Sequence, residues 1–301
     1  MTLKDYLVFI RWKNLLMILL IQFLIKFILF QKFDLSVSLD NLHFFLLSLS
    51  TICIAAAGYI INDIHDIKAD LINKPNRVFV SKKISVSRAN NLFIAINSIG
   101  LLLGFYLSFY INHNSFFIIF ILTSLLLYRY AIDLKNRLLI GNVVIAVIVF
   151  FSIMIIVVFD IVPATNNYNN QTQIHIVKLL LLISGFAFSL TLLREIIKDL
   201  EDVIGDKKIN AKTLPIVWGE TKTKKFLFFL SLFIFMGINY FSFLLYQSNL
   251  YAAAYLTIIV SLPLLYFLLM INRSKTKNDY HKLSGLLKII MLLGILTILF
   301  L

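Results

Sequence analysis

Charged residues are scarce in this chain, and so are the residues that interrupt helices. Only 14% of the 301 residues are charged, and the sequence contains 10 glycines and 4 prolines. Hydrophobic residues make up 60% of the chain, and the mean hydropathy is +0.91. A soluble domain of this size needs far more charge on its surface. The composition therefore excludes an ordinary soluble enzyme.

Cysteine is almost absent as well. The single one, Cys53, lies within an apolar run, which excludes an intramolecular disulfide and any cysteine-rich metal site. The N-terminus also lacks a short apolar core followed by a small-residue cleavage site. We therefore expect the first apolar run to be retained as a membrane span.

Long apolar runs alternate with short polar segments, and this pattern predicts an all-α polytopic membrane protein. We expect nine transmembrane helices in a bundle, at about residues 14–30, 42–61, 92–110, 115–127, 138–158, 174–193, 226–246, 251–271 and 286–301. Pro263 is isolated within the eighth run, and we expect a kink there. Lys26 is a lone base in the first run, and we expect it to snorkel to the interface.

The distribution of the basic residues predicts an orientation. The net charge of +13 could indicate a nucleic acid, but the bases lie in the loops between spans. When alternate loops are assigned to opposite sides, 24 of the 28 Lys and Arg residues fall on the side of the N-terminus. The positive-inside rule then places the N-terminus in the cytoplasm. We expect a bacterial or archaeal cell membrane as the location, no nucleic-acid partner and no obligate protein partner.

Carboxylates concentrate in two polar segments that adjoin apolar runs. In the first segment, an amide and three carboxylates have helical spacing and follow one stripe: Asn62, Asp63, Asp66 and Asp70. In the second segment, four carboxylates follow one stripe in the same way: Glu195, Asp199, Asp202 and Asp206. Both segments fall on the expected cytoplasmic side, so we expect them to form one site there.

The two segments also share a spacing. The triad Asp63, Asp66 and Asp70 recurs 136 residues later as Asp199, Asp202 and Asp206, with four expected helices per offset. Such symmetry is typical of internal repeats in membrane proteins. We predict a single domain over residues 1–301, with two related four-helix units at about 14–137 and 138–285 and a ninth helix.

Carboxylates gathered in this way indicate a bound cation. Parallel carboxylates repel one another unless a cation lies among them, and each costs about 3 kcal/mol if drawn toward the bilayer centre. Hard oxygen ligands suit Mg²⁺, which prefers a few carboxylates together with substrate phosphate oxygens. No His or Cys arrangement has zinc spacing, and we interpret His65 as a bystander on the helix face.

Two other interpretations of the acidic segments stay open. Acidic residues at helix ends are often solvated loop residues, and the carboxylates of a transporter bind coupling ions. Against a transporter, both segments lie at the ends of spans rather than at mid-membrane, and no span is broken by a Gly/Pro pair.

Two stretches carry a resemblance to a known family. The first reads Asn62-Asp63-x-x-Asp66-x-x-x-Asp70-x-x-Asn73-x-Pro75-x-Arg77. The second reads Asp199-x-x-Asp202-x-x-Gly205-Asp206, with Lys212-Thr213-Leu214-Pro215 beyond it. Together with nine helices, they resemble the two signatures of the UbiA family of intramembrane prenyltransferases. The chain departs from the family at Asn210, where Gly is usual, and at Trp12, where Pro is frequent.

The resemblance implies transfer of a prenyl group from a polyprenyl diphosphate to a lipophilic acceptor. Metal ions and bases stabilise a departing diphosphate electrostatically. By carry-over, two sets hold the Mg²⁺–diphosphate and are catalytic: Asn62, Asp66 and Asp70 on one side, and Asp202 and Asp206 on the other. Asp63 and Asp199 would support them as metal ligands or beside the ligands. The candidates to touch phosphate oxygens are Arg77, Lys135 and Lys212, although such bases are also ordinary loop charges. Tyr128 is a candidate to stabilise an allylic cation.

The run from Arg194 to Asp206 bears on the acceptor. It resembles the digeranylgeranylglyceryl phosphate synthase branch of the family, which implies geranylgeranyl diphosphate as donor and geranylgeranylglyceryl phosphate as acceptor. A phosphate on the acceptor would also suit Arg194 and Lys198. Prenylation of a quinone precursor (4-hydroxybenzoate, dihydroxynaphthoate or homogentisate) or of haem stays open, because all these branches share the diphosphate site.

Overall fold

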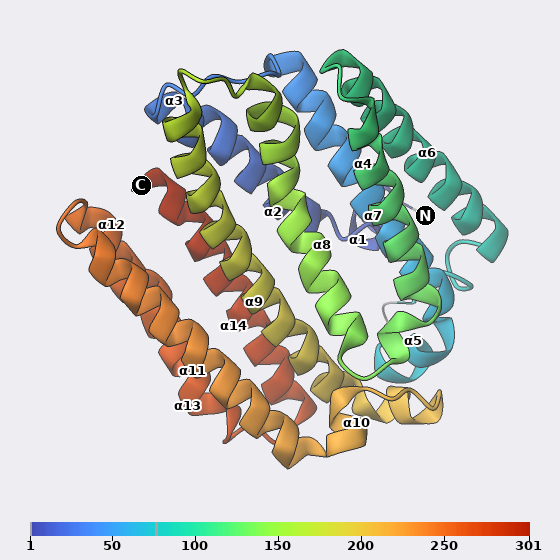
Figure 1. Cartoon of the computed structure of the whole chain (residues 1–301). Helices are drawn as coiled ribbons and strands as arrows, with labels where there is room; N and C mark the ends of the chain where they lie inside the picture. The colour runs from blue at the N-terminus through green and yellow to red at the C-terminus, as the bar shows by residue number, and fades with distance from the viewer. Residues whose placement is uncertain (1, 76–77) are drawn as a thin grey trace.

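The chain forms a bundle of long helices, as the hydropathy pattern predicts. The computed structural model describes residues 2–75 and 78–301. Nine helices in these residues are long and apolar enough to cross a membrane: Trp12–Lys32, Asn41–His65, Val86–Tyr110, Asn114–Ile132, Ile140–Ala164, Asn170–Lys208, Glu220–Leu245, Leu250–Ile271 and Lys277–Leu299. They run roughly side by side in Figure 1. The all-α fold class is confirmed.

Several spans consist of more than one helical segment. The α-helices are α1 (Leu3–Phe9), α2 (Trp12–Leu24), α3 (Phe30–Lys32), α4 (Asn41–His65), α5 (Ile67–Asn73), α6 (Val86–Tyr110), α7 (Phe117–Ile132), α8 (Ile140–Ile156), α9 (Asn170–Lys208), α10 (Leu214–Trp218), α11 (Glu220–Leu245), α12 (Leu250–Tyr255), α13 (Leu262–Ile271) and α14 (Lys277–Leu296). The π- and 3₁₀-helical segments are η1 (Ile25–Leu29), η3 (Asn114–Phe116), η4 (Leu134–Asn136), η5 (Val157–Ile161), η6 (Val162–Ala164), η7 (Leu256–Ser261) and η8 (Thr297–Leu299).

The helices extend beyond the apolar runs into the polar segments between them. The largest difference is in α9, whose 39 residues span about 58 Å at 1.5 Å per residue. That length exceeds the hydrocarbon thickness of about 30 Å. The second acidic segment is therefore the protruding end of a rigid helix. Similarly, α6 begins at Val86 because the Ser85 side chain accepts a hydrogen bond from the backbone N–H of Arg88.

Three spans change from α- to π-helical hydrogen bonding. One π segment, η7, immediately precedes Pro263, which occupies the first turn of α13. Proline has no N–H to donate, so the α-helical ladder is interrupted at that position. The irregularity that we expected at Pro263 is thus a π turn. The other two π segments, η1 and η5, contain Lys26 and Asp160.

Lys26 does not snorkel to the interface. Its side chain is 6% exposed, and its Nζ donates to Asp160 Oδ2 and to the carbonyl of Leu39, each at 2.7 Å. The other carboxylate oxygen of Asp160 accepts a hydrogen bond from the backbone N–H of Leu39 at 2.8 Å. The expectation that Lys26 snorkels to the interface is therefore wrong. The sequence does not reveal its carboxylate partner, because Asp160 lies 134 residues away.

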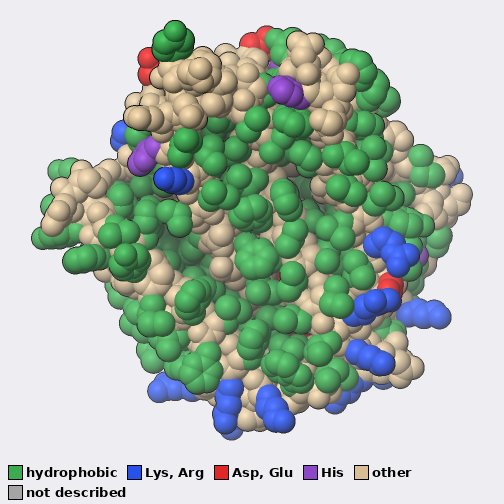
Figure 2. Space-filling view, viewed as in Figure 1, with side chains coloured by type: hydrophobic (Ala, Val, Ile, Leu, Met, Phe, Trp, Pro, Cys, Tyr) green, Lys and Arg blue, Asp and Glu red, His purple; other side chains and the backbone are tan. Residues whose placement is uncertain are grey.

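The two ends of the bundle differ in charge. Helices α5 and α10 lie at one end, near the last turns of α9 and the first turns of α8 (Figure 1). Figure 2 shows Lys and Arg side chains gathered along that edge, whereas the face between the ends is mostly hydrophobic. Large apolar side chains on α11, such as Phe229, Phe233 and Phe243, are at least 65% exposed. An apolar band with a basic edge is the surface that a bilayer requires.

Candidate active site

Both acidic segments line one cavity. It has a volume of about 760 Å³, and its lining includes carboxylates of α5 and of the last turns of α9, which lie at the basic end of the bundle (Figure 1). Its lining includes all seven residues that we predicted as metal ligands: Asn62, Asp63, Asp66, Asp70, Asp199, Asp202 and Asp206. The deeper walls are apolar, with Met17, Ile54 and Phe186 among the lining residues. The fold thus brings together the two segments that the shared spacing had paired.

The first acidic segment is not one continuous helix. Helix α4 ends at His65, and Asp66 (φ −91°, ψ 0°) separates it from α5. The predicted single stripe over this segment is therefore wrong in its geometry, although its members share the cavity. The break directs the Asp66 carboxylate to two donors. Asn62 Nδ2 donates to Oδ2 at 2.6 Å, and Lys135 Nζ, on η4, donates to Oδ1 at 2.6 Å.

Asp63 forms an ion pair with Arg11, which precedes the first span. Arg11 lies between α1 and α2 in a left-handed conformation (φ 55°), and its NH2 donates to Asp63 Oδ1 at 2.7 Å. The guanidinium also lies over the Tyr59 ring, 4.7 Å from its centroid. Arg11 therefore neutralises the Asp63 carboxylate.

The second acidic segment has the predicted continuous stripe, because α9 is unbroken through it. Asn142 Nδ2, near the start of α8, donates to Asp199 Oδ2 at 2.8 Å. Lys74 Nζ donates to Asp202 Oδ2 at 2.5 Å. Burial alone lowers the pKa of Lys74, but the Asp202 carboxylate outweighs it and raises that pKa, so Lys74 stays protonated.

Helix α5 is fastened to α9 through one amide side chain. Asn73 Nδ2 donates to the carbonyl of Asp202, and the N–H of Gly205 donates to Asn73 Oδ1, both at 3.0 Å. A Cβ on Gly205 would lie 2.3 Å from Asn73 Nδ2, so only glycine allows this approach. Lys277 Nζ, at the start of α14, donates to the carbonyl of Asn73 at 2.6 Å. These contacts fix the spacing between the two acidic segments.

The carboxylates fit a divalent cation that takes much of its coordination from substrate. Oδ1 of Asp202 is buried and has no hydrogen-bond partner among residues 2–75 and 78–301. Within the same residues, no three side chains of His, Cys, Asp or Glu are grouped as a complete metal cage. Mg²⁺ characteristically binds through one or two carboxylates plus phosphate oxygens and water. Paired acidic segments at the two sides of one cavity supply that donor set.

Burial and the neighbouring Asp66 carboxylate raise the pKa of Asp70 to about 6. A nearby ammonium, Lys74, opposes this effect only in part. Asp70 therefore lies where an added positive charge would be strongly stabilised.

Two of the predicted substrate-binding residues that the structure describes, Tyr128 and Lys212, are not among those that line the cavity. Tyr128 is 40% exposed and stacks with Phe93, with ring centroids 6.1 Å apart. Lys212 is exposed, and its backbone N–H donates to the carbonyl of Asn136. Arg77 lies outside the described residues. Lys135, by contrast, lines the cavity as predicted.

Several cavity residues were not predicted from the sequence. Tyr130 lines the cavity in place of Tyr128, because residues two apart on a helix point in nearly opposite directions. Lys74 lines the cavity and holds the Asp202 carboxylate, and Lys288 enters the cavity from α14. Asn142 is not a lining residue, but it holds the Asp199 carboxylate. The signal for Asn142 and Lys288 is in the sequence, since each is a polar residue within or beside an apolar run.

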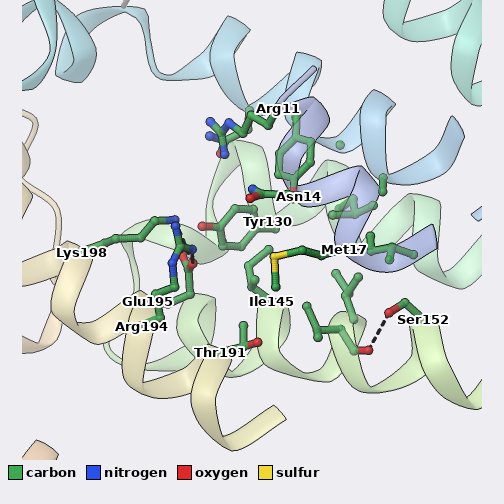
Figure 3. A pocket seen from close by; sticks show the side chains of 18 of the residues that line it. Arg11, Asn14, Met17, Tyr130, Ile145, Ser152, Thr191, Arg194, Glu195 and Lys198 are labelled. Carbon is green, nitrogen blue, oxygen red and sulfur yellow. Dashed lines mark hydrogen bonds and ion pairs between the residues drawn. The ribbon is translucent and has the colours of Figure 1, made fainter. Parts of the chain in front are cut away.

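Basic side chains form one wall of the cavity, deeper than the carboxylates. Lys198 Nζ donates to both carboxylate oxygens of Glu195, at 2.8 and 3.1 Å, and Arg194 NH1 donates to Glu195 Oε1 at 3.2 Å. Figure 3 shows these three head groups together at one side of the pocket, with the Tyr130 hydroxyl directed toward them.

Comparison with known proteins shows which family has this architecture. The model of the UbiA prenyltransferase family matches residues 27–292. Digeranylgeranylglyceryl phosphate synthase of Methanosphaera stadtmanae is 33% identical over 85% of this chain and 87% of its own length. The synthase of Methanobrevibacter smithii is 31% identical over 98% of this chain and 96% of its own.

Comparison with solved structures points to the same family as comparison with the relatives. A structure described as digeranylgeranylglyceryl phosphate synthase in membranes is 27% identical, with a TM-score of 0.63 over 99% of this chain and 97% of that one. A UbiA homologue from Archaeoglobus fulgidus, bound to GPP and Mg²⁺, shares the fold at 17% identity, with a TM-score of 0.63 over 98% of this chain and 99% of its own. The chain therefore belongs to the UbiA prenyltransferase family, which makes it a membrane-embedded prenyltransferase and sets the transporter interpretation aside.

Proposed function

We propose that this enzyme transfers the geranylgeranyl group of geranylgeranyl diphosphate to the glycerol hydroxyl of geranylgeranylglyceryl phosphate. The relatives that match over most of the chain are digeranylgeranylglyceryl phosphate synthases. The observation that carries the proposal is the pairing of carboxylates with a separate basic wall in one cavity. That pairing suits two phosphorylated substrates, one bound through a metal and one bound directly.

The chemistry is a substitution at the first carbon of the donor. The bond between this carbon and the diphosphate oxygen breaks, and its electron pair leaves with the diphosphate. The acceptor oxygen bonds to the same carbon, and its proton passes to the released diphosphate. An electrophile of this kind needs stabilisation of the departing charge and protection from water.

The chain divides these tasks among the cavity residues. Asn62, Asp66 and Asp70 on one side, and Asp202 and Asp206 on the other, would hold Mg²⁺. When bound, Mg²⁺ neutralises the charge that develops on the departing diphosphate. Asp63 and Asp199 support the ligands through their contacts with Arg11 and Asn142.

Lys74 and Lys135 already donate to rim carboxylates, so both ammonium groups are within reach of phosphate oxygens bound there. The apolar walls accept prenyl chains and exclude water. The ring face of Tyr130 would stabilise positive charge on the allylic carbon. In this proposal Tyr130 takes the role that the sequence had assigned to Tyr128.

The orientation follows from the basic edge of the bundle. The positive-inside rule applied to that edge places the mouth of the cavity on the cytoplasmic side of a bacterial or archaeal cell membrane. Both phosphorylated substrates would then enter from the compartment in which charged metabolites are made.

A direct assay separates this function from prenylation of an aromatic ring or of haem. Purified protein receives geranylgeranyl diphosphate and Mg²⁺, with either geranylgeranylglyceryl phosphate or 4-hydroxybenzoate, dihydroxynaphthoate, homogentisate or haem. We expect diphosphate release and a doubly alkylated glycerol ether only with the lipid phosphate. Prenylation of an aromatic acceptor or of haem, without reaction of the lipid, would contradict the proposal.

A further inference from the structure

The lysine in the last span has no carboxylate partner among residues 2–75 and 78–301. Lys288 lies in the middle of α14, where charged side chains are costly and mark functional sites. In the described residues its Nζ donates only to the side-chain oxygen of Asn14, at 2.6 Å, and it forms no ion pair. Lys26 is the counterexample, because Asp160 neutralises it.

Other positive groups enter the cavity beside Lys288. Arg194 and Lys13 are two of them. All three line the same cavity, together with Lys198 and Glu195. Arg194 and Lys198 share one carboxylate, Glu195, and Lys288 forms no ion pair in the described residues, so these three positive groups have one carboxylate among them. Such a concentration of positive charge in a half-buried cavity attracts an anion.

The basic wall also holds unused hydrogen-bond donors. Arg194 carries five N–H donors, of which one contacts Glu195. Its Nε is buried and has no partner in residues 2–75 and 78–301. Lys288 has three donors and spends one on Asn14. A planar guanidinium beside two ammonium groups is suited to the several oxygens of a phosphate.

The wall is separate from the place where the donor diphosphate would bind. On α9, Arg194 is eight residues from Asp202 and Lys198 is four, which corresponds to about 12 and 6 Å along the helix axis. A phosphate on the wall would leave the adjoining glycerol carbons pointing toward the carboxylates. That placement presents a glycerol hydroxyl to the allylic carbon of the donor.

We propose that Lys288, Arg194 and Lys198 bind the phosphate of the lipid acceptor, and that Lys288 gives the enzyme its preference for a phosphorylated acceptor. This inference rests on the proposed function. It assigns a specificity-determining role to a residue that lies in neither acidic segment. The Asn14 side-chain oxygen, on α2, accepts from the ammonium and holds it in place.

The test compares two acceptors that differ only in the phosphate: geranylgeranylglyceryl phosphate and geranylgeranylglycerol. The enzyme variants are Lys288→Met, Lys288→Arg and Lys178→Met. Lys178→Met is the matched control, because Lys178 lies in span α9 but does not line the cavity. Initial rates are measured in detergent at saturating Mg²⁺, with the acceptor varied at saturating geranylgeranyl diphosphate and the diphosphate varied at saturating acceptor.

We expect Lys288→Met to raise the KM for the phosphorylated acceptor about tenfold or more, the scale of a lost charge-assisted hydrogen bond. The KM for the donor and the rate with geranylgeranylglycerol should stay within about threefold of wild type, on the same scale of energies. Lys288→Arg should restore most of the preference, and Lys178→Met should match wild type.

Two outcomes with Lys288→Met would overturn the inference. An equal loss with both acceptors would assign Lys288 a structural role. An unchanged preference in Lys288→Met would show that the ammonium does not meet the phosphate. If Lys288→Met is not recovered as folded protein, Arg194→Gln replaces it, with the same expected loss of preference. A wild-type enzyme that ignores the lipid phosphate and prenylates an aromatic acceptor would instead refute the proposed function, and the phosphate subsite with it.

Discussion

Two lysines within spans of this enzyme have opposite surroundings. Lys26 is enclosed between η1 and η5, and the chain itself supplies a carboxylate and a carbonyl for its ammonium. Lys288 lies in the cavity, and its partner among the described residues is one neutral amide, that of Asn14. Each is one ammonium in an apolar span, but the chain neutralises the first and leaves the second to a ligand.

The same contrast separates the two carboxylate environments. Asp160 is fully buried, and both of its side-chain oxygens accept hydrogen bonds. Asp202 has one oxygen paired with Lys74 and one buried oxygen without a partner in the described residues. We infer that satisfied charges hold the bundle together, whereas incompletely satisfied charges serve binding and chemistry. Substitutions at the two kinds of site should therefore separate stability from activity.

The largest expected effect is at the cavity rim. Asp66→Asn or Asp202→Asn removes a negative charge that we propose binds Mg²⁺, while the amide retains the shape of the side chain. We expect turnover to fall about 10³-fold or more, corresponding to about 4 kcal/mol of lost transition-state stabilisation. The measurement is diphosphate release at saturating substrates.

Asp34→Asn is the matched control for the rim variants. Asp34 is exposed, lies outside the cavity, and has a positive φ of 45° that asparagine adopts readily. The rim variants and the control should melt within a few degrees of wild type in detergent. Near-normal turnover in Asp202→Asn, or a large drop in its melting temperature, would contradict the inference that this carboxylate serves activity rather than stability.

The next effect is at the enclosed pair, where stability should change instead. Lys26→Met leaves the Asp160 carboxylate buried without its cation, which costs about 3 kcal/mol. We expect the free energy of unfolding in detergent to fall by that amount, measured by denaturant titration. The turnover of the folded fraction should remain close to wild type.

A double variant tests whether the stability lost in Lys26→Met comes from the uncompensated charge of Asp160. Replacing a buried ion pair with apolar side chains is often neutral. Lys26→Met/Asp160→Leu should therefore regain at least half of the lost stability, although the backbone N–H of Leu39 loses its acceptor. A double variant less stable than Lys26→Met would show that Asp160 acts mainly through its hydrogen bonds to backbone.

The sequence predicts the fold and the existence of the site better than it predicts the contacts within it. Hydropathy locates nine spans because a backbone in lipid must satisfy its hydrogen bonds as helix. The motif spacing brings Asp66 and Asp202 to one cavity, as predicted. The helix break at Asp66 was not predictable, because the spacing of its neighbours also fits one continuous helix.

Long-range pairing explains the remaining differences. The partner of Lys26 is 134 residues away, and the partner of Lys74 is 128 residues away, so no local pattern reveals either contact. The choice between Tyr128 and Tyr130 depends on the rotation of α7 about its axis, which a uniformly apolar run does not determine. The roles of the site residues and the two-repeat organisation stay predictions.

The smallest expected effect is a pH dependence of Mg²⁺ binding that arises at the rim and not at the enclosed pair. The pKa of Asp70 is about 6 because of burial and the adjacent Asp66 carboxylate. Mg²⁺ binds the deprotonated form, so protons compete with it below this pH. We expect the half-saturating Mg²⁺ concentration to be constant above about pH 7 and to rise about tenfold per unit below pH 6.

The sign of the accompanying stability change follows from the same pKa. An unfolded Asp titrates near pH 3.9, so between about pH 4 and 6 the folded protein binds the Asp70 proton more tightly than the unfolded chain does. Without Mg²⁺, this contribution to stability therefore decreases as the pH rises through that window. With Mg²⁺, the trend should reverse, because the ion stabilises the folded protein more as Asp70 loses its proton. Melting temperatures with and without Mg²⁺ at pH 5, 6 and 7 measure both trends. The difference between the profiles with and without Mg²⁺ should be the same in the Lys26→Met/Asp160→Leu variant as in wild type; a changed difference would mean that the enclosed pair and the rim are coupled.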